Sequence, residues 1–332
     1  MNPHWTLTTP HSVRSLWDGL VRAGGAETFF QTPVWSELIV AVFPHWRIAP
    51  LSLEFDDGNK VLVPFLRRAV IPGIAYAESV VPGVYGGPLF LRNPDREHWL
   101  ALWRALTRLP NFVLIENPFF PSCGDPSFER RFLFTQVLDL EAGYAQVSKG
   151  FSKGHKSDIK AASKAKIEIC RAASVQDIED YYFAYRDSLS RWGSRAGGFY
   201  PLKLFAHLFQ HVEFGNAIRL WLARFENKLI AGGWFFYHRA QVTYWHSAVL
   251  AEYMGIHPMH LLIDAVIRDA CALGMQQLDL CPSGGLVGVE KFKNGFGARK
   301  LEFSSYRRLN PFGRAFRLSR YLFEHYRRQS SL

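Results

Sequence analysis

The sequence is poor in cysteine and contains no long hydrophobic run. Its four cysteines are scattered along the chain: Cys123, Cys170, Cys271 and Cys281. None of them forms a CxxC pair, and no histidine lies at the spacing of a zinc-binding motif. This pattern is typical of reduced thiols in a cytoplasmic protein, so neither a zinc site nor a disulfide framework is indicated. No apolar run reaches the roughly 18 residues that a membrane-spanning helix needs. The first residues also lack the charged-then-apolar order of a signal peptide, so we expect a cytoplasmic protein.

The chain is long and basic. Its 332 residues exceed what one hydrophobic core usually holds, so two domains are expected. The order of elements divides the chain into residues 1–135 and 136–306, with the tail 307–332 packed back on the first domain. Hydrophobic residues make up 48% and charged residues 20%, which is a globular composition without signs of disorder. The net charge of +10 favours an anionic partner, such as RNA, a phosphorylated small molecule or an acidic membrane surface.

Hydrophobic periodicity predicts a mixed arrangement of helices and strands. In the first domain, helices are expected over 13–23 and 98–109, and the segment 30–35 leads into another helix that ends near Val42. Strands are expected over 48–55, 60–68, 85–91 and 112–116. This order is typical of an α/β unit with a mostly continuous sheet. In the second domain, strand 135–140 precedes helices 177–192 and 202–211, antiparallel strands 218–225, 228–237 and 241–248, helix 259–273 and strand 278–280. The last strand–helix–strand set predicts a βαβ crossover, with room for an anion at the helix N-terminus.

The most informative stretch is residues 277–303. Strand 278–280 is broken by the turn residues 282–285, and a second strand is expected over 300–306. Between them, the sequence FKNGFG (292–297) places Lys293 between two aromatic residues and near two glycines, where the backbone could approach a ligand closely. One interpretation is an anion-binding edge. The alternative is a β-hairpin whose glycines serve the turns and whose lysine is solvated.

Basic residues form a regular stripe near the start of the second domain. Their spacing of 4, 3, 4 and 4 residues places them on one face of a helix: Lys149, Lys153, Lys156, Lys160 and Lys164. Because like charges on one face repel each other, so regular a stripe indicates an anionic partner. The alternative is an ordinary solvated face. The tail, residues 304–332, carries seven arginines against one acid, Glu324. It could lie on an anionic membrane surface, although packing on the body of the protein is the simpler interpretation.

Taken together, these elements resemble the Fem family of tandem acyltransferases, and similarly the cellulose-biosynthesis-type branch of GNAT acetyltransferases. The resemblance is carried by segment 31–35, the basic helix 149–166, Tyr244–Ala248, helix 259–273 with Gly274, Asp279 and, above all, residues 292–297. It implies an α/β (α+β) fold of two tandem GNAT-type domains, each a mixed, mainly antiparallel sheet flanked by helices.

The resemblance further implies transfer of an acyl or aminoacyl group to an amine of a cell-envelope or polysaccharide-related acceptor. The co-substrate would be an aminoacyl-tRNA or an acyl-CoA, with no bound cofactor. The acceptor could contain phosphate or be lipid-linked, with contact to an anionic membrane at its inner face. Two alternatives remain open. One is an acyl-CoA-dependent N-acetyltransferase acting on a small molecule or a sugar amine, and the other is a non-catalytic binder of phosphorylated polymer or lipid.

By the same resemblance, Lys293 would stabilise the oxyanion that develops on the attacked carbonyl. Arg195 and Tyr200 correspond to donors for acceptor phosphates, and Tyr244 to a matching strand position. The remaining residues expected to contact substrate are Trp35, Phe292, Tyr253 and Gly255. Candidate bases for the amine proton are His246, Asp279 and His257.

The loop before helix 259–273 departs from the CoA-binding pattern. CoA-dependent GNAT enzymes carry Q/R-x-x-G-x-G/A here, whereas this loop reads Glu252-Tyr-Met-Gly255-Ile-His257. Glu252 would repel a pyrophosphate, which favours a charged tRNA as donor. However, no heptad run indicates the coiled-coil arm that many Fem proteins carry, so an acyl-CoA donor also stays open.

Overall fold

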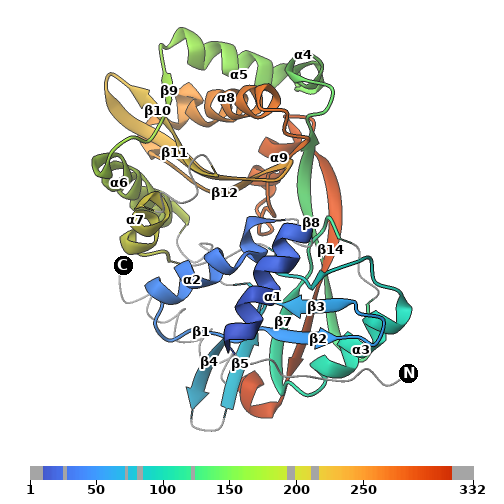
Figure 1. Ribbon diagram of the computed structural model, residues 1–332. Helices are drawn as coiled ribbons and strands as arrows, with labels where there is room; N and C mark the ends of the chain where they lie inside the picture. The colour runs from blue at the N-terminus through green and yellow to red at the C-terminus, as the bar shows by residue number, and fades with distance from the viewer. Residues whose placement is uncertain are drawn as a thin grey trace. The chain divides into compact units, whose positions relative to one another are not determined.

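The computed structural model describes residues 10–24, 28–71, 74–80, 85–120, 124–192, 199–210 and 217–315. The chain forms two compact units (Figure 1). Unit 1 comprises Met1–Phe134 and Glu302–Leu332, and unit 2 comprises Thr135–Leu301. The predicted boundaries, at 135 and 306, fall close to these positions. The tail is assigned to unit 1, although residues 316–332 lie outside the described part of the chain.

Unit 1 contains short strands and three main helices. Its elements are α1 (Pro10–Ala23), η1 (Phe29–Gln31), α2 (Pro33–Val42), β1 (Arg47–Ile48), β2 (Leu51–Glu54), β3 (Lys60–Val63), β4 (Leu66–Ile71), β5 (Ile74–Glu78), β6 (Leu89–Phe90), α3 (Arg96–Leu106) and β7 (Asn111–Ile115). Strands β8 (Glu129–Asp139) and β14 (Arg299–Leu309) continue into unit 2.

The prediction of one mostly continuous sheet in this unit is wrong. The strands form the order β1-β4-β5-β7-β14 and a separate three-stranded sheet, β2-β3-β6. The expected strands 48–55 and 60–68 are each split, and Pro50 and Pro64 lie at the breaks. Proline has no N–H to donate to a sheet, so it interrupts a strand that its apolar neighbours would otherwise continue. Of the expected strand 85–91, only Leu89–Phe90 forms a strand, β6.

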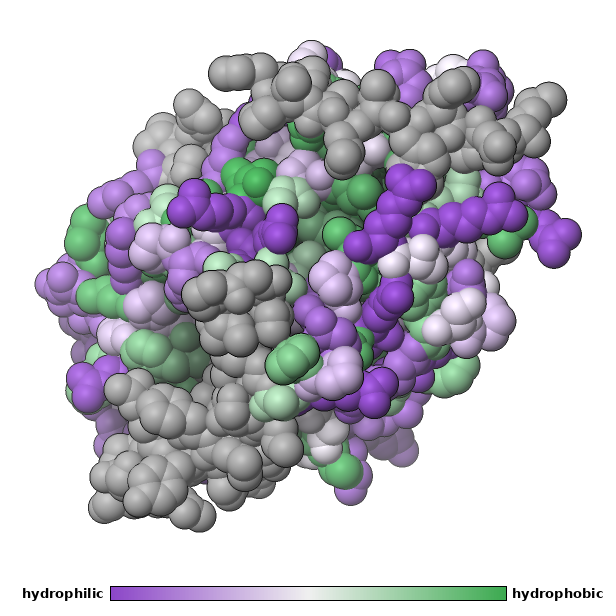
Figure 2. All heavy atoms as spheres, turned by 90° about the horizontal axis from the view of Figure 1, so that it is seen from below, coloured by the Kyte–Doolittle hydropathy of each residue, from purple (hydrophilic) through white to green (hydrophobic). Residues whose placement is uncertain are grey.

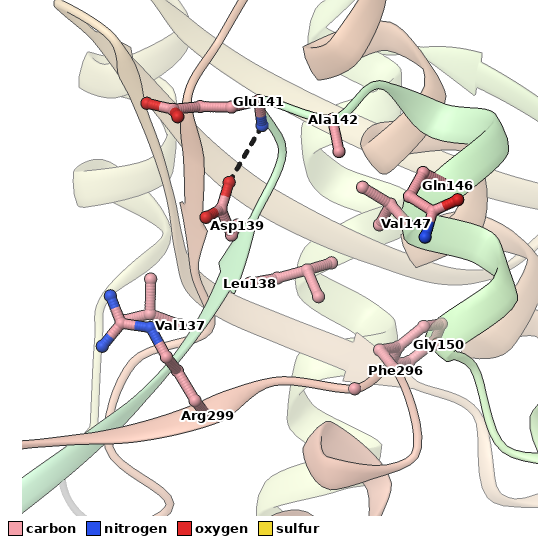
Figure 3. A pocket seen from close by; sticks show the side chains of 11 residues that line it. Val137, Leu138, Asp139, Glu141, Ala142, Gln146, Val147, Gly150, Phe296 and Arg299 are labelled. Carbon is pink, nitrogen blue, oxygen red and sulfur yellow. Dashed lines mark hydrogen bonds between the residues drawn. The ribbon is translucent and has the colours of Figure 1, made fainter.

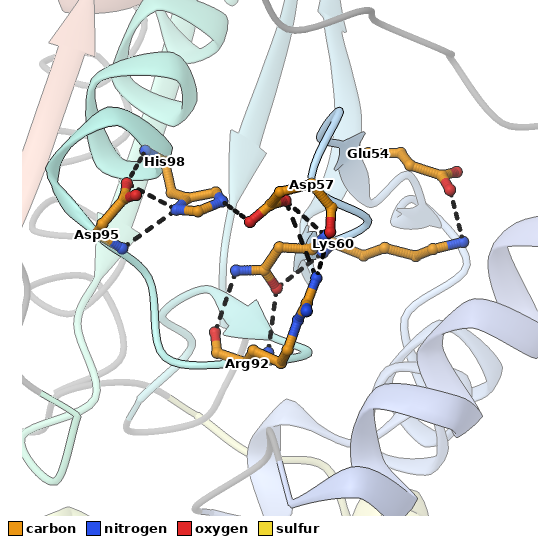
Figure 4. A network of polar contacts seen from close by, with 7 residues as sticks. Glu54, Asp57, Lys60, Arg92, Asp95 and His98 are labelled. Atoms are coloured by element: carbon orange, nitrogen blue, oxygen red, sulfur yellow. Dashed lines mark hydrogen bonds and ion pairs between the residues drawn. The ribbon is translucent and has the colours of Figure 1, made fainter.

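A polar network fixes the start of α3 (Figure 4). Asp95 caps the helix by accepting from the backbone N–H of His98 at 3.0 Å. The His98 ring in turn accepts from the Asp95 N–H at 3.1 Å and lies 3.3 Å from the Asp57 carboxylate. The contacts join α3 to the β2–β3 turn, and they account for the burial of a histidine in the first helical turn.

Unit 2 is built around a six-stranded arrangement in the order β8-β13-β12-β11-β10-β9. Its further elements are α4 (Tyr144–Val147), η2 (Ser148–Gly150), α5 (Lys153–Lys164), β9 (Glu168–Arg171), α6 (Val175–Trp192), α7 (Leu202–Gln210), β10 (Ile218–Phe225), β11 (Lys228–His238), β12 (Gln241–Val249), η5 (Ala251–Ile256), α8 (Pro258–Ala272), β13 (Gln277–Asp279) and α9 (Val287–Asn294). The predicted strands and long helices of this domain agree with these bounds within a few residues.

The sheet of unit 2 is mixed and mainly antiparallel, as expected for its fold. Strands β12 and β13 pair in parallel and are joined by α8, which confirms the predicted βαβ crossover. The pairings of β9 with β10, β10 with β11, β11 with β12, and β13 with β8 are antiparallel. Helices α5 and α8 cover one face of the sheet, and α6 and α7 cover the other (Figure 1).

Coverage on both faces explains the sequence of β11. Nearly all of its side chains are buried, so its hydrophobic residues run consecutively instead of alternating. Gly232 lies where α6 approaches most closely, because a Cβ at this position would come within 2.8 Å of the Tyr181 ring. The tight turn that begins this strand uses Glu226 and Asn227, both with positive φ, as a two-residue hairpin requires.

Two local predictions in unit 2 are wrong. The FKNGFG stretch is neither a loop nor a β-hairpin, because α9 includes Phe292–Asn294 and ends just before Gly295. Lys149 lies outside the helix that carries the other four lysines of the stripe, in η2. Helix α5 begins after Ser152, whose hydroxyl caps it by accepting from the His155 N–H at 3.1 Å.

The surface in Figure 2 mixes hydrophilic and hydrophobic side chains over the coloured residues, which is normal for a solvated face. Within the described ranges, no helix is both long and apolar enough to span a membrane. The cysteines described there, Cys170, Cys271 and Cys281, are free thiols.

Candidate active site

Strands β12 and β13 part after a short parallel ladder. Their pairing covers only Gln241–Thr243 against Gln277–Asp279, while β12 continues to Val249. After Asp279 the chain turns sharply through Cys281, which has a left-handed φ of 61°. On its other edge, β12 has a bulge at Trp245, because Trp234 pairs with His246 and Phe235 with Tyr244. A bulge increases local twist and re-aims side chains, so the strand's geometry changes where the two strands separate.

Lys293 projects from α9 into the space beside β13. It is only 4% exposed, and its ammonium group donates to the carbonyl oxygens of Cys281 at 2.8 Å and Pro282 at 3.2 Å. Burial lowers the pKa of Lys293 to about 8, while the nearby Cys281 and Asp279 act in the opposite direction. The group therefore stays mainly protonated at neutral pH but is poorly solvated. Such a cation interacts strongly with any negative charge that forms beside it.

Asp279 is fully buried next to this lysine. It accepts from the Thr135 hydroxyl at 2.5 Å and from the Cys281 N–H at 2.9 Å. Burial, followed by the charge of Asp279, raises the pKa of the Cys281 thiol well above its usual range. Cys281 is thus a neutral thiol and not an activated nucleophile.

Gln136 of β8 connects the elements that carry this site. Its amide donates to the Asn294 side chain at 2.7 Å and to the Glu290 carbonyl at 3.0 Å, both on α9. Its oxygen accepts from the Ser283 hydroxyl at 2.9 Å. The buried amide therefore holds α9 and the 282–285 turn against β8. Thr135, Gln136 and Ser283 were not predicted as site residues; the available signal was that Thr135 and Gln136 are adjacent polar residues in the middle of β8.

An aromatic cluster surrounds His246 of β12. Its Nδ1 lies 2.5 Å from the Tyr181 hydroxyl, and its ring contacts those of Tyr185, Tyr200 and Phe205. Burial lowers the pKa of His246 to about 3, so the imidazole is neutral at physiological pH. A neutral ring can accept the Tyr181 proton at Nδ1.

Tyr200 and Tyr244 both lie near Cys281, whose carbonyl oxygen accepts from Lys293. Burial raises the pKa of both phenols, and electrostatic interaction with Cys281 adds to the rise. Among the predicted site residues, Lys293 and Asp279 both contact Cys281, Tyr200 packs against the ring of His246, and Tyr244 stacks on Phe235. Arg195 lies outside the described residues.

The remaining predicted substrate-binding residues lie elsewhere. Trp35 is a core side chain of unit 1, 1% exposed and packed against Phe29 and Phe30. Tyr253 and Gly255 belong to η5. Phe292 is next to Lys293 in sequence but projects from another side of α9, where it packs against the rings of His155 and His260.

The loop that precedes α8 differs from a phosphate-binding loop in several respects. Glu252 is exposed and bound to Lys228 at 2.8 Å. His257 has a left-handed backbone, and Pro258 begins the helix without an N–H to donate. A helix N-terminus binds anions through its free N–H groups, so this one offers fewer of them.

The basic stripe is exposed. Lys153, Lys156, Lys160 and Lys164 project from α5, and Lys156 reaches back to the carbonyl oxygen of Lys149 at 2.8 Å. This contact links the first turn of α5 to the preceding residues and leaves the lysine stripe exposed to solvent. Its binding to an anionic partner stays a prediction.

A separate cavity of about 620 Å³ lies between β8, α4, η2 and the segment that follows α9 (Figure 3). Leu138, Val147 and Phe296 supply apolar surface, and Asp139 and Arg299 supply charge. Lys293 does not line this cavity.

Comparison with known proteins identifies the domain that carries the site. Residues 151–294 match the family described as Acetyltransferase (GNAT) domain. No curated protein matches the chain. Among solved structures, the chain is similar to FemX, with a TM-score of 0.63 and 11% identity over 91% of this chain and 96% of that one. It is also similar to a conserved protein of unknown function from Bacteroides thetaiotaomicron, with a TM-score of 0.56 and 9% identity over 93% and 100% of the two chains.

A third similar structure is L-PGS from Bacillus licheniformis, with a TM-score of 0.52 and 12% identity over 87% of this chain and 96% of that one. At such identities the likeness concerns the fold, and it confirms the architecture that the resemblance to the Fem family implied. Residues 151–294 are therefore a GNAT acetyltransferase domain, which lies within unit 2, and the chain as a whole has a fold similar to that of FemX.

Proposed function

We propose that unit 2 transfers an aminoacyl group to an amine of a cell-envelope acceptor, with Lys293 stabilising the tetrahedral intermediate. The similarity of the fold to FemX and L-PGS supports the aminoacyl reaction, and the GNAT domain supports acyl transfer in general. The enzyme would act in the cytoplasm, at the inner face of the membrane, where a lipid-linked acceptor is presented.

The observation that carries the proposal is the hydrogen bonding of the buried Lys293. An ammonium group has three protons. Two are directed to the carbonyl oxygens of Cys281 and Pro282, and no third acceptor is found among the described residues. The third proton can therefore be donated to the carbonyl oxygen of a bound acyl donor.

The reaction balances without a cofactor. The acceptor amine attacks the donor carbonyl, a C–N bond forms, and the negative charge moves to the carbonyl oxygen beside Lys293. Collapse of the intermediate breaks the C–O bond of an aminoacyl-tRNA ester, or the C–S bond of a thioester, and the amine proton leaves with water or the leaving group. Removing one preorganised donor to such an oxyanion typically costs about 2.7–4 kcal/mol in the barrier.

Positioning, and not a dedicated base, would supply most of the remaining rate enhancement. With a pKa of about 3, His246 is a weak base at neutral pH. The Asp279 carboxylate already accepts from Thr135 and Cys281. We assign both residues to positioning: Asp279 at the turn that holds the Lys293 acceptors, and His246 within the aromatic cluster.

The proposal also specifies the acyl donor. GNAT domains in general use acyl-CoA. The exposed lysine stripe, the net charge of +10 and a helix α8 that begins with Pro258 favour a charged tRNA instead.

The test is a transfer assay with the purified protein. A mixture of tRNAs charged with labelled amino acids and, separately, labelled acetyl-CoA are offered with lipid-linked peptidoglycan precursor, phosphatidylglycerol or simple amines as acceptors. We expect label to pass from tRNA to an envelope acceptor, and Lys293→Met to slow the transfer by about 10²–10³-fold. Lys291→Met is the matched control, because Lys291 is an exposed lysine of the same helix.

The outcomes separate the alternatives. If label is transferred only from acetyl-CoA, the acyl donor is an acyl-CoA and not a charged tRNA, and the proposed role of Lys293 is unaffected. Salt-sensitive binding of phosphorylated ligands without transfer from either donor would favour the non-catalytic binder. Transfer that Lys293→Met does not affect would contradict the assignment of the lysine.

A further inference from the structure

Three histidines and one aspartate converge where α5 meets the start of α8. His155 and Asp158 are three residues apart on α5, and His257 and His260 are three residues apart at the start of α8. This spacing places His155 and Asp158 on the same face of α5, whereas His257 is the left-handed residue that precedes α8. Ligand atoms of His155, Asp158 and His260 all lie within 4.8 Å of one another. His257 is not part of this 4.8 Å group, although its Nε2 lies 3.7 Å from Asp158. The three residues together with His257 are called the α5–α8 cluster below.

Distances within the α5–α8 cluster approach those of a coordination sphere. Nε2 of His260 lies 3.4 Å from one carboxylate oxygen of Asp158, and Nε2 of His257 lies 3.7 Å from the other. Zinc binds nitrogen and oxygen ligands at about 2.0–2.2 Å in a tetrahedron, which places neighbouring ligand atoms about 3.3 Å apart. The His260–Asp158 separation is close to such an edge, His257 faces the other carboxylate oxygen, and the ligand atom of His155 lies within 4.8 Å of those of Asp158 and His260.

The surroundings hold His155 in a ligand-like orientation. Its Nε2 lies 2.7 Å from the backbone carbonyl oxygen of Phe292, so Nδ1 is the ring nitrogen that would bind a metal ion. Metal-binding histidines usually donate their other N–H to a carbonyl or carboxylate in this way. The ring also packs on Gly295, where a Cβ would come within 2.1 Å of its Cε1. The glycine thus makes room for this ring at the end of α9.

His257 is positioned by an unusual backbone conformation. Its φ of 59° is left-handed, a conformation that costs a non-glycine residue about 1–2 kcal/mol. The residue ends η5 and precedes Pro258, and its ring nevertheless faces Asp158. Local backbone strain of this kind persists where the surrounding structure requires a particular side-chain position.

We propose that His155, Asp158, His257 and His260 bind a divalent transition-metal ion, and that Zn²⁺ suits the donor set best. Imidazoles with a single carboxylate suit zinc, copper or nickel better than calcium or magnesium, which prefer oxygen ligands. The cluster has one negative charge, so the bound ion carries net positive charge beside the lysine stripe of α5. The ion joins α5 to α8 and, through the Phe292 carbonyl, to α9, the helix that carries Lys293.

The test uses the full chain freed of metal with a chelator and dialysed. Added Zn²⁺ is expected to bind at one ion per chain by calorimetry and to raise the thermal unfolding midpoint by mass action. Co²⁺ in its place is expected to give the visible absorption of a tetrahedral nitrogen–oxygen site. His260→Ala and Asp158→Asn are each expected to weaken Zn²⁺ binding about tenfold or more. His207→Ala, a partly exposed histidine of α7, is expected to bind as the wild type does.

The metal-free protein provides the control for folding. If the variants unfold at the wild-type midpoint in chelator but lose the Zn²⁺-dependent increase, the α5–α8 cluster is the site. Absence of stoichiometric Zn²⁺ binding to the wild type, an octahedral Co²⁺ spectrum, or an unchanged Zn²⁺ affinity in both variants would overturn the proposal. A variant that does not fold is replaced by His257→Gln, judged by the same two measurements.

Discussion

The ammonium group of Lys293 lies 2.8 Å from the carbonyl oxygen of Cys281, a residue whose backbone is left-handed. A left-handed residue turns the chain sharply, and here the carbonyls of two consecutive residues, Cys281 and Pro282, accept from the same lysine. The site thus combines a strained turn at the end of β13 with a buried cation on α9. A lysine held in this way has little rotational freedom to lose when a substrate carbonyl arrives, which is the condition for electrostatic preorganisation.

Lys293→Met should reduce kcat by about 10²–10³-fold, because it removes a donor to the developing oxyanion while keeping the apolar stem. The measurement is single-turnover transfer with saturating donor, so that binding and chemistry are separated. Lys291→Met should stay within about threefold of the wild type. Equal losses in the two variants would indicate a general effect of charge on substrate binding.

The same lysine should make stability depend on pH. Its pKa is about 8 in the folded chain against 10.5 for an unperturbed lysine. Between these values the unfolded chain holds a proton that the folded chain has released, so the free energy of unfolding rises with pH. Below pH 8 both states are protonated, and the folded state bears the full cost of the buried charge.

Urea unfolding of the wild type and Lys293→Met at pH 7 and pH 9.5 measures this dependence. The difference in unfolding free energy between the two should shift by about 2 kcal/mol in favour of the wild type at the higher pH. Comparing the two proteins cancels the titration of other groups. A difference that does not change with pH would mean that Lys293 has an ordinary pKa.

Much of unit 2 was predictable because its elements are long and strongly periodic. Strands 218–225, 228–237 and 241–248 and helix 259–273 were predicted to within about a residue at most ends. The parallel pairing of β12 and β13 also followed from the order strand, helix, strand. In unit 1 the strands are short, and Pro50 and Pro64 divide runs whose apolar residues suggest longer ones.

The site was harder to predict because it depends on tertiary contacts. Lys293 was identified, but its glycine-rich neighbours suggested a loop, whereas Gly295 follows the end of α9 and makes room for His155. Gln136 contacts residues about 150 positions away, so no local pattern marks its role. The α5–α8 cluster likewise forms from two short spacings about 100 residues apart, and only the packing of α5 on α8 brings them together.

Gln136→Met should destabilise the chain and reduce transfer. The substitution keeps the volume but removes the partners of Ser283, Asn294 and the Glu290 carbonyl. Leaving buried polar groups unsatisfied typically costs about 1–3 kcal/mol. Chemical unfolding and single-turnover rates should both change, because α9 and the 282–285 turn lose their common anchor. Gln146→Met on α4, where the side chain is exposed, should change neither.

The variant His246→Asn tests whether His246 acts as the general base or only positions its neighbours. The Asn oxygen can accept from the Tyr181 hydroxyl much as Nδ1 does, so the aromatic cluster keeps its central hydrogen bond. A general base typically contributes about 10²–10⁴-fold, whereas a neutral positioning residue with a preserved contact should cost less than about tenfold. We expect the smaller loss in kcat, together with an unchanged pH profile between pH 6 and 8, because a group with a pKa of about 3 does not titrate there. A loss above 10²-fold in a variant that unfolds like the wild type would assign His246 as the base after all, with a pKa raised by bound substrate.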